Sequence, residues 1–188
     1  MGPVHAYLLA GLVIHKVLWE AMRLRAGQAR ETFQPIKAVK IAALAVLFAQ
    51  LFIPPVLPIG GPPVWLPVFG VTLYTIGLVI AILGRVQLGN NWSNVESATV
   101  LPSQNLVRRG LYGHVRHPIY LGDVMLVIGF QLALGSWLVL LGLPLGAYVW
   151  RKARQEESLL LARLPGYVAY LASTGRFLPR WPASAGPL

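Results

Sequence analysis

Long apolar runs separated by clusters of basic residues constrain this chain more than any other feature. Four runs lie at about residues 4–22, 38–53, 64–83 and 118–150. A helix needs about 20 mostly apolar residues to cross the roughly 30 Å hydrocarbon core of a bilayer. The last run is too long for one span, and Gly135-Ser136 interrupts it near its middle. The pattern predicts an all-α integral membrane protein with about five transmembrane helices, the last two forming a C-terminal helical hairpin.

The composition indicates that lipid is the solvent for much of the chain. Charged residues make up 12% of it, whereas a typical soluble domain has about 25%. The net charge of +10 could indicate nucleic-acid binding, but the basic residues lie between the apolar runs. We therefore predict no nucleic-acid partner. Cysteine is absent and the four histidines lack a metal-ligand spacing, so we expect no metal site.

The distribution of Lys and Arg predicts the orientation of the spans. With five spans and the N-terminus outside, every Lys and Arg except Lys16 falls in or next to a cytoplasmic loop, as the positive-inside rule requires. Lys16 and Glu20 lie four residues apart and can pair on one helix face. No cleavable signal peptide is evident. We expect a multi-pass protein whose active site faces the cytoplasm.

The chain divides at about residue 86 into two predicted regions. Residues 1–86 form an N-terminal three-helix membrane region, and residues 87–188 carry the site. The second region begins with a polar stretch, residues 87–113, which cannot cross a bilayer and is a candidate ligand-binding segment. Residues 151–173 are amphipathic and basic. We expect them to lie at the membrane surface or to cap the cytoplasmic face.

The predicted hairpin brings together the segments that flank it. Each arm covers roughly 25 to 27 Å, so the chain returns to the side that it left. The segment before the hairpin reads Arg116-His117-Pro118-Ile119-Tyr120-Leu121-Gly122, and the segment after it contains Glu156-Glu157. An imidazole and a pair of carboxylates are therefore expected to meet at the membrane surface.

These two segments carry a family resemblance. The pattern Arg-His-Pro-x-Tyr-x-Gly followed by Glu-Glu-x-x-Leu resembles the signature of the isoprenylcysteine carboxyl methyltransferases, which are related to phospholipid N-methyltransferases. The resemblance covers about residues 87–179. It implies an integral membrane methyltransferase that uses S-adenosyl-L-methionine without a Rossmann fold. The implied acceptor is the carboxylate of a prenylcysteine-like or other amphipathic, lipid-like molecule that arrives from the bilayer.

The resemblance also implies which residues bind the cofactor. They are Gln104, Asn105, Leu106, Val107, Tyr112, His117, Pro118, Ile119, Tyr120 and Glu156. Proline suits the first turn of a helix, so the backbone just before Pro118 is expected to present free N–H groups and a positive dipole end that can hold the cofactor's carboxylate. Glu156 can pair with the cofactor's amino group or offset its sulfonium charge. Tyrosine rings can stack on adenine or face the sulfonium.

The acceptor needs an anchoring cation. A carboxylate is already ionised at neutral pH, so methyl transfer requires alignment and a cation rather than a general base. In the family an arginine just before the Glu-Glu pair serves the substrate, and here that position holds Lys152. Arg151 and Arg176 are the other candidate catalytic cations.

Three alternatives to this function stay open. N-methylation of a phospholipid amine must release a proton, and His114 or Glu157 could accept it. A membrane reductase-like relative would use a nicotinamide cofactor instead, and a non-catalytic relative would keep only the fold. Structural roles are also open for Arg116 as a membrane anchor and for His117 as a helix cap.

Overall fold

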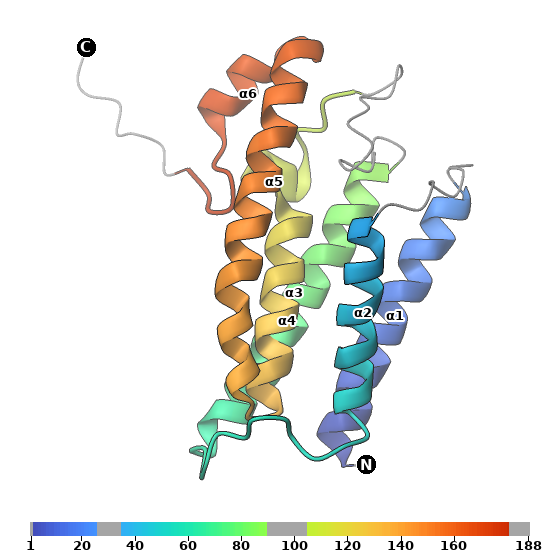
Figure 1. Ribbon diagram of the computed structural model, residues 1–188. Helices are drawn as coiled ribbons and strands as arrows, with labels where there is room; N and C mark the ends of the chain where they lie inside the picture. Colours follow the sequence, from blue (N-terminus) through green and yellow to red (C-terminus); the bar gives the residue numbers. More distant parts are fainter. Residues whose placement is uncertain (1, 26–34, 90–104, 181–188) are drawn as a thin grey trace, which may run out of the picture. The chain divides into compact units, whose positions relative to one another are not determined.

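The computed structural model describes residues 2–25, 35–89 and 105–180, and all regular structure in these ranges is helical. The elements are α1 (Pro3–Arg25), α2 (Pro35–Gln50), α3 (Trp65–Leu88), η3 (Gly110–Gly113), α4 (Pro118–Ala133), η4 (Trp137–Leu141), α5 (Gly142–Arg163) and α6 (Tyr167–Ser173) (Figure 1). The symbol η marks a 3₁₀-helix. The predicted all-α class is confirmed.

Proline and glycine set the beginnings of several helices. α1, α2 and α4 each begin at a proline, Pro3, Pro35 and Pro118. The first helical position suits proline because its fixed φ is helical and an N–H there would have no intrahelical acceptor. α6 follows Gly166, whose φ of 77° is left-handed and costs glycine little. Local chemistry thus sets where α4 and α6 begin.

The chain forms two compact units. Unit 1 contains Met1–Leu78 and Val124–Leu143, and unit 2 contains Val79–Asp123 and Pro144–Leu188. Helices α3, α4 and α5 each contribute residues to both units. The units therefore interleave along the chain, whereas the predicted division at residue 86 separates functional regions in sequence order. That division stays a prediction.

Unit 1 is built around an apolar core. Its buried members are Leu8, Leu12, Leu51, Tyr74, Leu126, Phe130, Ala133 and Leu134. Glycines allow α3 and α4 to approach closely: a Cβ at Gly70 would lie 2.2 Å from the Ala133 nitrogen, and a Cβ at Gly129 2.3 Å from the Tyr74 nitrogen. The Tyr74 hydroxyl donates to the Leu8 carbonyl at 2.7 Å and ties α1 to α3.

The Pro- and Gly-rich connection between α2 and α3 is tied to the turn after α4. The Trp137 N–H donates to the Leu57 carbonyl at 2.9 Å, and the Ser136 hydroxyl donates to the Val56 carbonyl at 2.6 Å. Gly135 has a φ of 60° and lies at the break that interrupts the last apolar run of the sequence. These bonds give the charge-free loop a defined path.

In unit 2 the helix of the last apolar run is longer than the run itself. α5 continues from its apolar first half to Arg163, and α6 follows after a short break. The stretch from Ala147 to Leu164 contains neither proline nor glycine, so nothing in it interrupts the helix. That residues 151–173 lie at the membrane surface or cap the cytoplasmic face stays a prediction.

Membrane-spanning character is clearest for α3. Among the described residues, α3 alone is long and apolar enough by length and composition to cross a bilayer. α4 has 16 residues and is about 24 Å long, somewhat less than the hydrocarbon core. α1 carries His15, Lys16 and Glu20 within its apolar run. The predicted number of five spans therefore stays a prediction.

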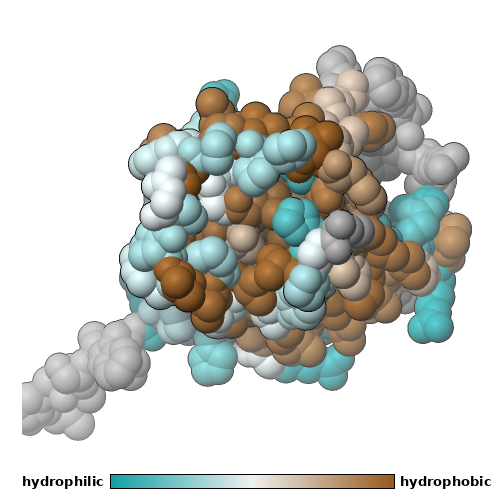
Figure 2. Space-filling model, turned by 90° about the horizontal axis from the view of Figure 1, so that it is seen from below, coloured by the Kyte–Doolittle hydropathy of each residue, from teal (hydrophilic) through white to brown (hydrophobic). Residues whose placement is uncertain are grey.

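The surface carries many exposed apolar side chains. Val17, Val68 and Leu143 are 60%, 63% and 75% exposed, and apolar residues cover much of the face that Figure 2 shows. Many exposed apolar side chains are typical of a surface in contact with a membrane or a partner. The exposure agrees with lipid as the solvent of the helical walls.

Candidate functional site

The residues before α4 pair with the residues after α6 in unit 2. Val115 and Gly175 form an isolated parallel bridge. The Arg116 N–H donates to the Gly175 carbonyl at 2.9 Å, and the His117 N–H donates to the Arg176 carbonyl at 3.1 Å. Two segments about 60 residues apart in sequence are thereby fixed in register. The expectation of free N–H groups just before Pro118 was wrong, because the segment after α6 accepts these hydrogen bonds. This register brings the side chains of Arg116, His117 and Arg176 to one point on α5.

That point is Glu157, a buried carboxylate that all three side chains contact. Arg116 Nε donates to it at 2.8 Å, and Arg176 Nη2 donates at 2.6 Å. His117 Nε2 lies 3.3 Å from Oε1. Burial raises the pKa of Glu157, but hydrogen bonds from His117, Arg176 and Arg116 outweigh it and hold the pKa well below its usual range. Glu157 is therefore an ionised group whose charge two guanidiniums compensate.

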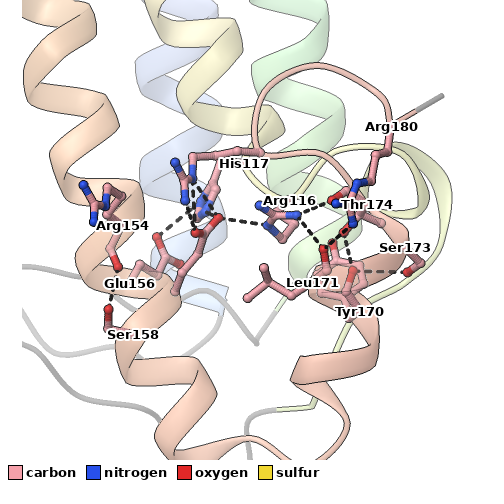
Figure 3. Close-up of polar contacts among 12 residues, drawn as sticks. Arg116, His117, Arg154, Glu156, Ser158, Tyr170, Leu171, Ser173, Thr174 and Arg180 are labelled. Atoms are coloured by element: carbon pink, nitrogen blue, oxygen red, sulfur yellow. Dashed lines mark hydrogen bonds and ion pairs between the residues drawn. The ribbon is translucent and has the colours of Figure 1, made fainter. Parts of the chain in front are cut away.

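Arg116 also connects this cluster to the end of α6. Its Nη1 donates to the carbonyls of Leu171, at 3.3 Å, and Thr174 (Figure 3). Carbonyls at a helix C-terminus have no intrahelical donor, so the guanidinium satisfies acceptors that would otherwise need water. Arg116 thus joins α5 to α6 and is more than the membrane anchor that its sequence position suggests.

His117 lies between the two glutamates of α5. Its side chain is only 4% exposed, and Nδ1 lies 3.6 Å from Glu156 Oε2. The Tyr120 ring stacks on the imidazole, with 5.5 Å between centroids and 11° between planes. The Phe177 ring lies 5.9 Å from the imidazole on the segment after α6. The structure thus brings together His117, Tyr120 and Glu156, three of the residues predicted to bind the cofactor.

Glu156, unlike Glu157, lacks an arginine that compensates its charge in the described part of the chain. Among the described residues no guanidinium pairs with it, and its side chain is 26% exposed. Desolvation raises the pKa of Glu156 despite the opposing effects of His117 and of a hydrogen bond with Tyr120. An ionised carboxylate in such surroundings is stabilised by any cation that binds beside it. Glu156 is the carboxylate of this pair that is suited to a cationic ligand.

Two more predicted cofactor residues, Pro118 and Ile119, form the first turn of α4. Both are buried, and a Cβ at Gly84 of α3 would lie 3.1 Å from the Ile119 side chain. Tyr112 is buried in η3, and its carbonyl accepts a hydrogen bond from the Tyr170 hydroxyl at 2.7 Å. Burial, followed by the negative charge of Glu156, raises the pKa of Tyr112. Tyr112 therefore lies within the electrostatic field of Glu156.

The remaining predicted cofactor residues precede η3. Asn105 is exposed and Leu106 and Val107 are half-buried, in a segment without regular secondary structure. Gln104 lies outside the described residues. Further along, the Leu111 N–H donates to the Gln87 side chain at 2.8 Å and ties η3 to the end of α3. The segment is thus anchored at its C-terminal end.

The three candidate anchoring cations have different surroundings. Arg176 is engaged with Glu157 through Nε and Nη2, and this bonding raises its pKa. Lys152 lies four residues before Glu156 and therefore on the same side of α5. Arg151 is exposed. It precedes Lys152 by one residue, a step of about 100° around the helix axis, and therefore lies on another side of α5. Lys152 is the candidate whose position on α5 matches that of Glu156.

The central place of Glu157 was not predicted. Sequence reasoning placed Glu157 in the carboxylate pair that meets the imidazole and considered it as a base, but it considered Arg176 only as a substrate anchor. The Glu-Glu pair did signal the site. Its pairing with Arg176 depends on how the chain returns after α6, and hydrophobic patterning contains no information on that path.

The sequence is similar to a known family and to individual proteins. The sequence profile of the phospholipid methyltransferase family matches residues 65–164. The protein-S-isoprenylcysteine O-methyltransferase of Xenopus laevis is 31% identical over 93 residues, which are 50% of this chain and 32% of the relative. The enzyme of the same name from Schizosaccharomyces pombe is 28% identical over 89 residues, 46% of this chain and 38% of the relative. The chain therefore aligns with less than half the length of either relative.

The fold is also similar to a solved structure. The eukaryotic intramembrane Ras methyltransferase, an isoprenylcysteine carboxyl methyltransferase, superposes with a TM-score of 0.68. The match covers 95% of this chain and 68% of that chain at 19% sequence identity. At this identity the similarity is one of fold.

Proposed function

Because this chain belongs to the phospholipid methyltransferase family, we propose that it is a membrane-bound methyltransferase that uses S-adenosyl-L-methionine. The observation that carries the proposal is the contact between His117 and Glu156, 3.6 Å apart. Glu157 beside them is neutralised by arginines. This arrangement leaves one carboxylate, Glu156, to compensate the charge of a cationic ligand.

The residues present fit S-adenosyl-L-methionine, which when bound supplies an electrophilic methyl group from a sulfonium. Glu156 would offset positive charge on the ligand, and the N–H groups of Ile119 and Tyr120 in the first turn of α4 would hold its carboxylate. Pro118 has no N–H, and the Leu121 N–H donates to the His117 carbonyl. Tyr112 and Tyr120 offer aromatic surfaces next to Glu156. Gln104, Asn105, Leu106 and Val107 would complete the site, and His117 would keep the Glu156 carboxylate in place.

The acceptor that fits best is a carboxylate. An amine acceptor must lose a proton, and the depressed pKa of Glu157 makes that group a weak base. A carboxylate oxygen can attack directly, provided that a cation orients it. Lys152 is our first choice for this role, ahead of Arg151 and Arg176. The acceptor would be prenylcysteine-like or another amphipathic, lipid-like molecule, as the names of the relatives suggest.

The proposal includes a membrane topology. We place five spans across the bilayer with the N-terminus outside, which puts the basic ends of α1 and α3 and the His117–Glu156 contact on the cytoplasmic side. The exposed apolar side chains of α1, α3 and α5 support contact with lipid. In this arrangement an amphipathic acceptor would reach the site from the bilayer with its polar end at the interface.

Calorimetry with S-adenosyl-L-methionine tests the cofactor site. Glu156→Gln keeps the shape of the side chain but removes its charge, and we expect the affinity to fall at least about tenfold. The matched control is Glu20→Gln, which removes a carboxylate from the exposed side of α1 and should leave affinity unchanged. Unchanged affinity in Glu156→Gln would show that the cofactor binds elsewhere.

A labelled methyl donor tests the reaction. Incubation of membranes with the wild-type protein should yield methyl esters, which are cleaved by mild base. Stable N-methyl lipids in their place would favour the phospholipid amine reaction. Binding of NADPH instead of S-adenosyl-L-methionine would favour a reductase, and cofactor binding without any product would favour a non-catalytic relative.

A further inference from the structure

The surface of unit 2 carries an open groove on one side of α5. Its volume is about 290 Å³. All of the lining residues are spaced to fall on one side of the helix. They are Trp150, Arg151, Arg154, Gln155 and Ser158. Glu156 and Glu157, which contact His117, are absent from this lining.

The groove lining contains two positive charges. Arg151 and Arg154 are both exposed, and within the described part of the chain neither guanidinium is paired with a carboxylate. Figure 3 shows Arg154 and Ser158 on the side of α5 away from Arg116. The Ser158 hydroxyl donates to the Arg154 carbonyl at 3.0 Å, which leaves its oxygen able to accept. Two neighbouring guanidiniums without a counter-charge attract an anion.

The groove begins where the apolar part of α5 ends. No charged residue occurs between Gly142 and Val149, and Arg151 is the first. Trp150 stands at this boundary and is 49% exposed. Its ring contacts the Arg176 guanidinium, 4.5 Å from the centroid, so the indole is held in place. Tryptophan at such a boundary is typical of the level of lipid headgroups.

We propose that this groove binds the headgroup of an anionic phospholipid from the surrounding membrane. The guanidiniums of Arg151 and Arg154 hold the phosphodiester, because their planar forks match its oxygens. Trp150, which lies toward the apolar half of α5, contacts the lipid on the membrane side of its phosphate. The inference rests on the membrane topology proposed above but not on methyl transfer. It assigns Arg151 to a lipid site rather than to the acceptor, which Lys152 on another side of α5 would serve.

The test uses the full-length protein in nanodiscs of neutral phosphatidylcholine, into which phosphatidylglycerol is titrated. Bound lipid is counted by native mass spectrometry, and thermal unfolding is followed in parallel. We expect saturable binding of one phosphatidylglycerol. Arg151→Gln with Arg154→Gln should weaken it about 30-fold, given the usual contribution of each basic residue near anionic lipid. Trp150→Ala should weaken it by a smaller factor.

A matched control separates a site from general positive charge. Arg25→Gln with Arg163→Gln removes the same charge from exposed positions at the basic ends of α1 and α5, and it should bind like the wild type. Equal weakening in both double variants, or in neither, would overturn the proposal. Competition by soluble glycerophosphate at the same concentration would also overturn it, since the site would then recognise a free phosphate. Unfolding midpoints that match the wild type in neutral nanodiscs confirm that the variants fold.

This test is independent of the enzymatic proposal. Loss of lipid binding with intact cofactor affinity in the groove variants supports the lipid site. Cofactor binding that fails in the wild-type protein contradicts the methyltransferase proposal but leaves the phosphatidylglycerol titration unaffected.

Discussion

Arg176 binds Glu157 through two donors, with Nη2 2.6 Å from Oε2 and Nε 3.0 Å from Oε1. The ion pair with Arg176 distinguishes Glu157 from the adjacent Glu156, and the pKa values of the two carboxyl groups are shifted in opposite directions. The pKa of Glu157 is lowered by its hydrogen-bond donors, and the pKa of Glu156 is raised by desolvation. Glu157 is therefore ionised and paired with two arginines, whereas the charged form of Glu156 is disfavoured until a cationic ligand binds beside it.

Removal of the Glu157 carboxylate should destabilise the protein strongly. Glu157→Ala leaves the side chains of Arg116 and Arg176, which are 7% and 22% exposed, without their counter-charge. We expect a loss of about 3 kcal/mol in the free energy of unfolding. Glu20→Ala breaks an ion pair with Arg23 on the surface and should cost less than about 1 kcal/mol. Denaturant titration in detergent measures both, and similar losses would contradict the structural role of Glu157.

Removal of the Glu156 charge should have the opposite effect on stability. Desolvation disfavours the ionised side chain, so Glu156→Gln should stabilise the ligand-free protein by about 1 kcal/mol, as is common when a functional group is replaced. The same variant should bind S-adenosyl-L-methionine poorly. A less stable Glu156→Gln would show that the carboxylate serves the fold.

The pH dependence of unfolding should separate the two glutamates. The folded pKa of Glu156 is raised, so ionisation of this group costs stability above its folded pKa. This cost shrinks as the pH falls below that pKa and is gone below the unfolded value of about 4. The folded pKa of Glu157 is lowered. Its contribution is present above the unfolded value of about 4 and is lost only as the pH falls through the lower folded pKa. Unfolding midpoints of the wild type and Glu156→Gln should therefore converge on acidification. Parallel curves would rule out a raised pKa for Glu156.

The ring of Tyr120 should matter more than its hydroxyl. Tyr120→Phe keeps the stacking on His117 and removes one hydrogen bond to Glu156, so cofactor affinity should fall about fivefold. Tyr120→Leu also removes the stacked ring and should cost about fivefold more. Calorimetry measures both, with Tyr7→Phe in α1 as the control. Equal affinities in the two Tyr120 variants would show that stacking is unimportant.

The close approach of α3 and α4 should make Gly70 intolerant of alanine. A Cβ there would lie 2.2 Å from a backbone nitrogen of α4, whereas nothing lies within 4 Å of a Cβ at Gly146 in α5. Gly70→Ala should therefore destabilise unit 1 by about 3 kcal/mol. Gly146→Ala should be neutral or slightly stabilising, because alanine is the better helix former. Thermal unfolding tests both, and a neutral Gly70→Ala would mean that the helices do not touch there.

Two features could be predicted from the sequence. One is the start of α4 at Pro118, and the other is the contact between His117 and Glu156. Proline marks the beginnings of α1, α2 and α4, and the similar lengths of the two arms after Pro118 predict that their outer ends meet. Both inferences use local chemistry and helix geometry, which depend on few residues.

The ion pairs of Glu157 could not be predicted in the same way. They require Arg176 to lie opposite Glu157, and this depends on the backbone register between Val115 and Gly175. That register follows from the short α6 and from a turn at Gly166, neither of which has a strong periodic signal. The continuity of α5 was missed for another reason: its change from apolar to basic suggested a boundary, although the backbone has no cause to break there.

Lys152 provides the sharpest test of the acceptor. Its Nζ lies 6.0 Å from the centroid of the Tyr148 ring, on the side of α5 that carries Glu156. Lys152→Gln should lower kcat/KM for a carboxylate acceptor about tenfold, because one charge-assisted hydrogen bond is lost, and should leave the affinity for S-adenosyl-L-methionine unchanged. Lys152→Arg should restore much of the rate, since the charge returns. Arg163→Gln removes an exposed charge from the end of the same helix and serves as the control. An unchanged kcat/KM in Lys152→Gln would remove the anchoring role, and a loss of affinity for S-adenosyl-L-methionine in this variant would show that Lys152 acts on the fold or the cofactor rather than on the carboxylate.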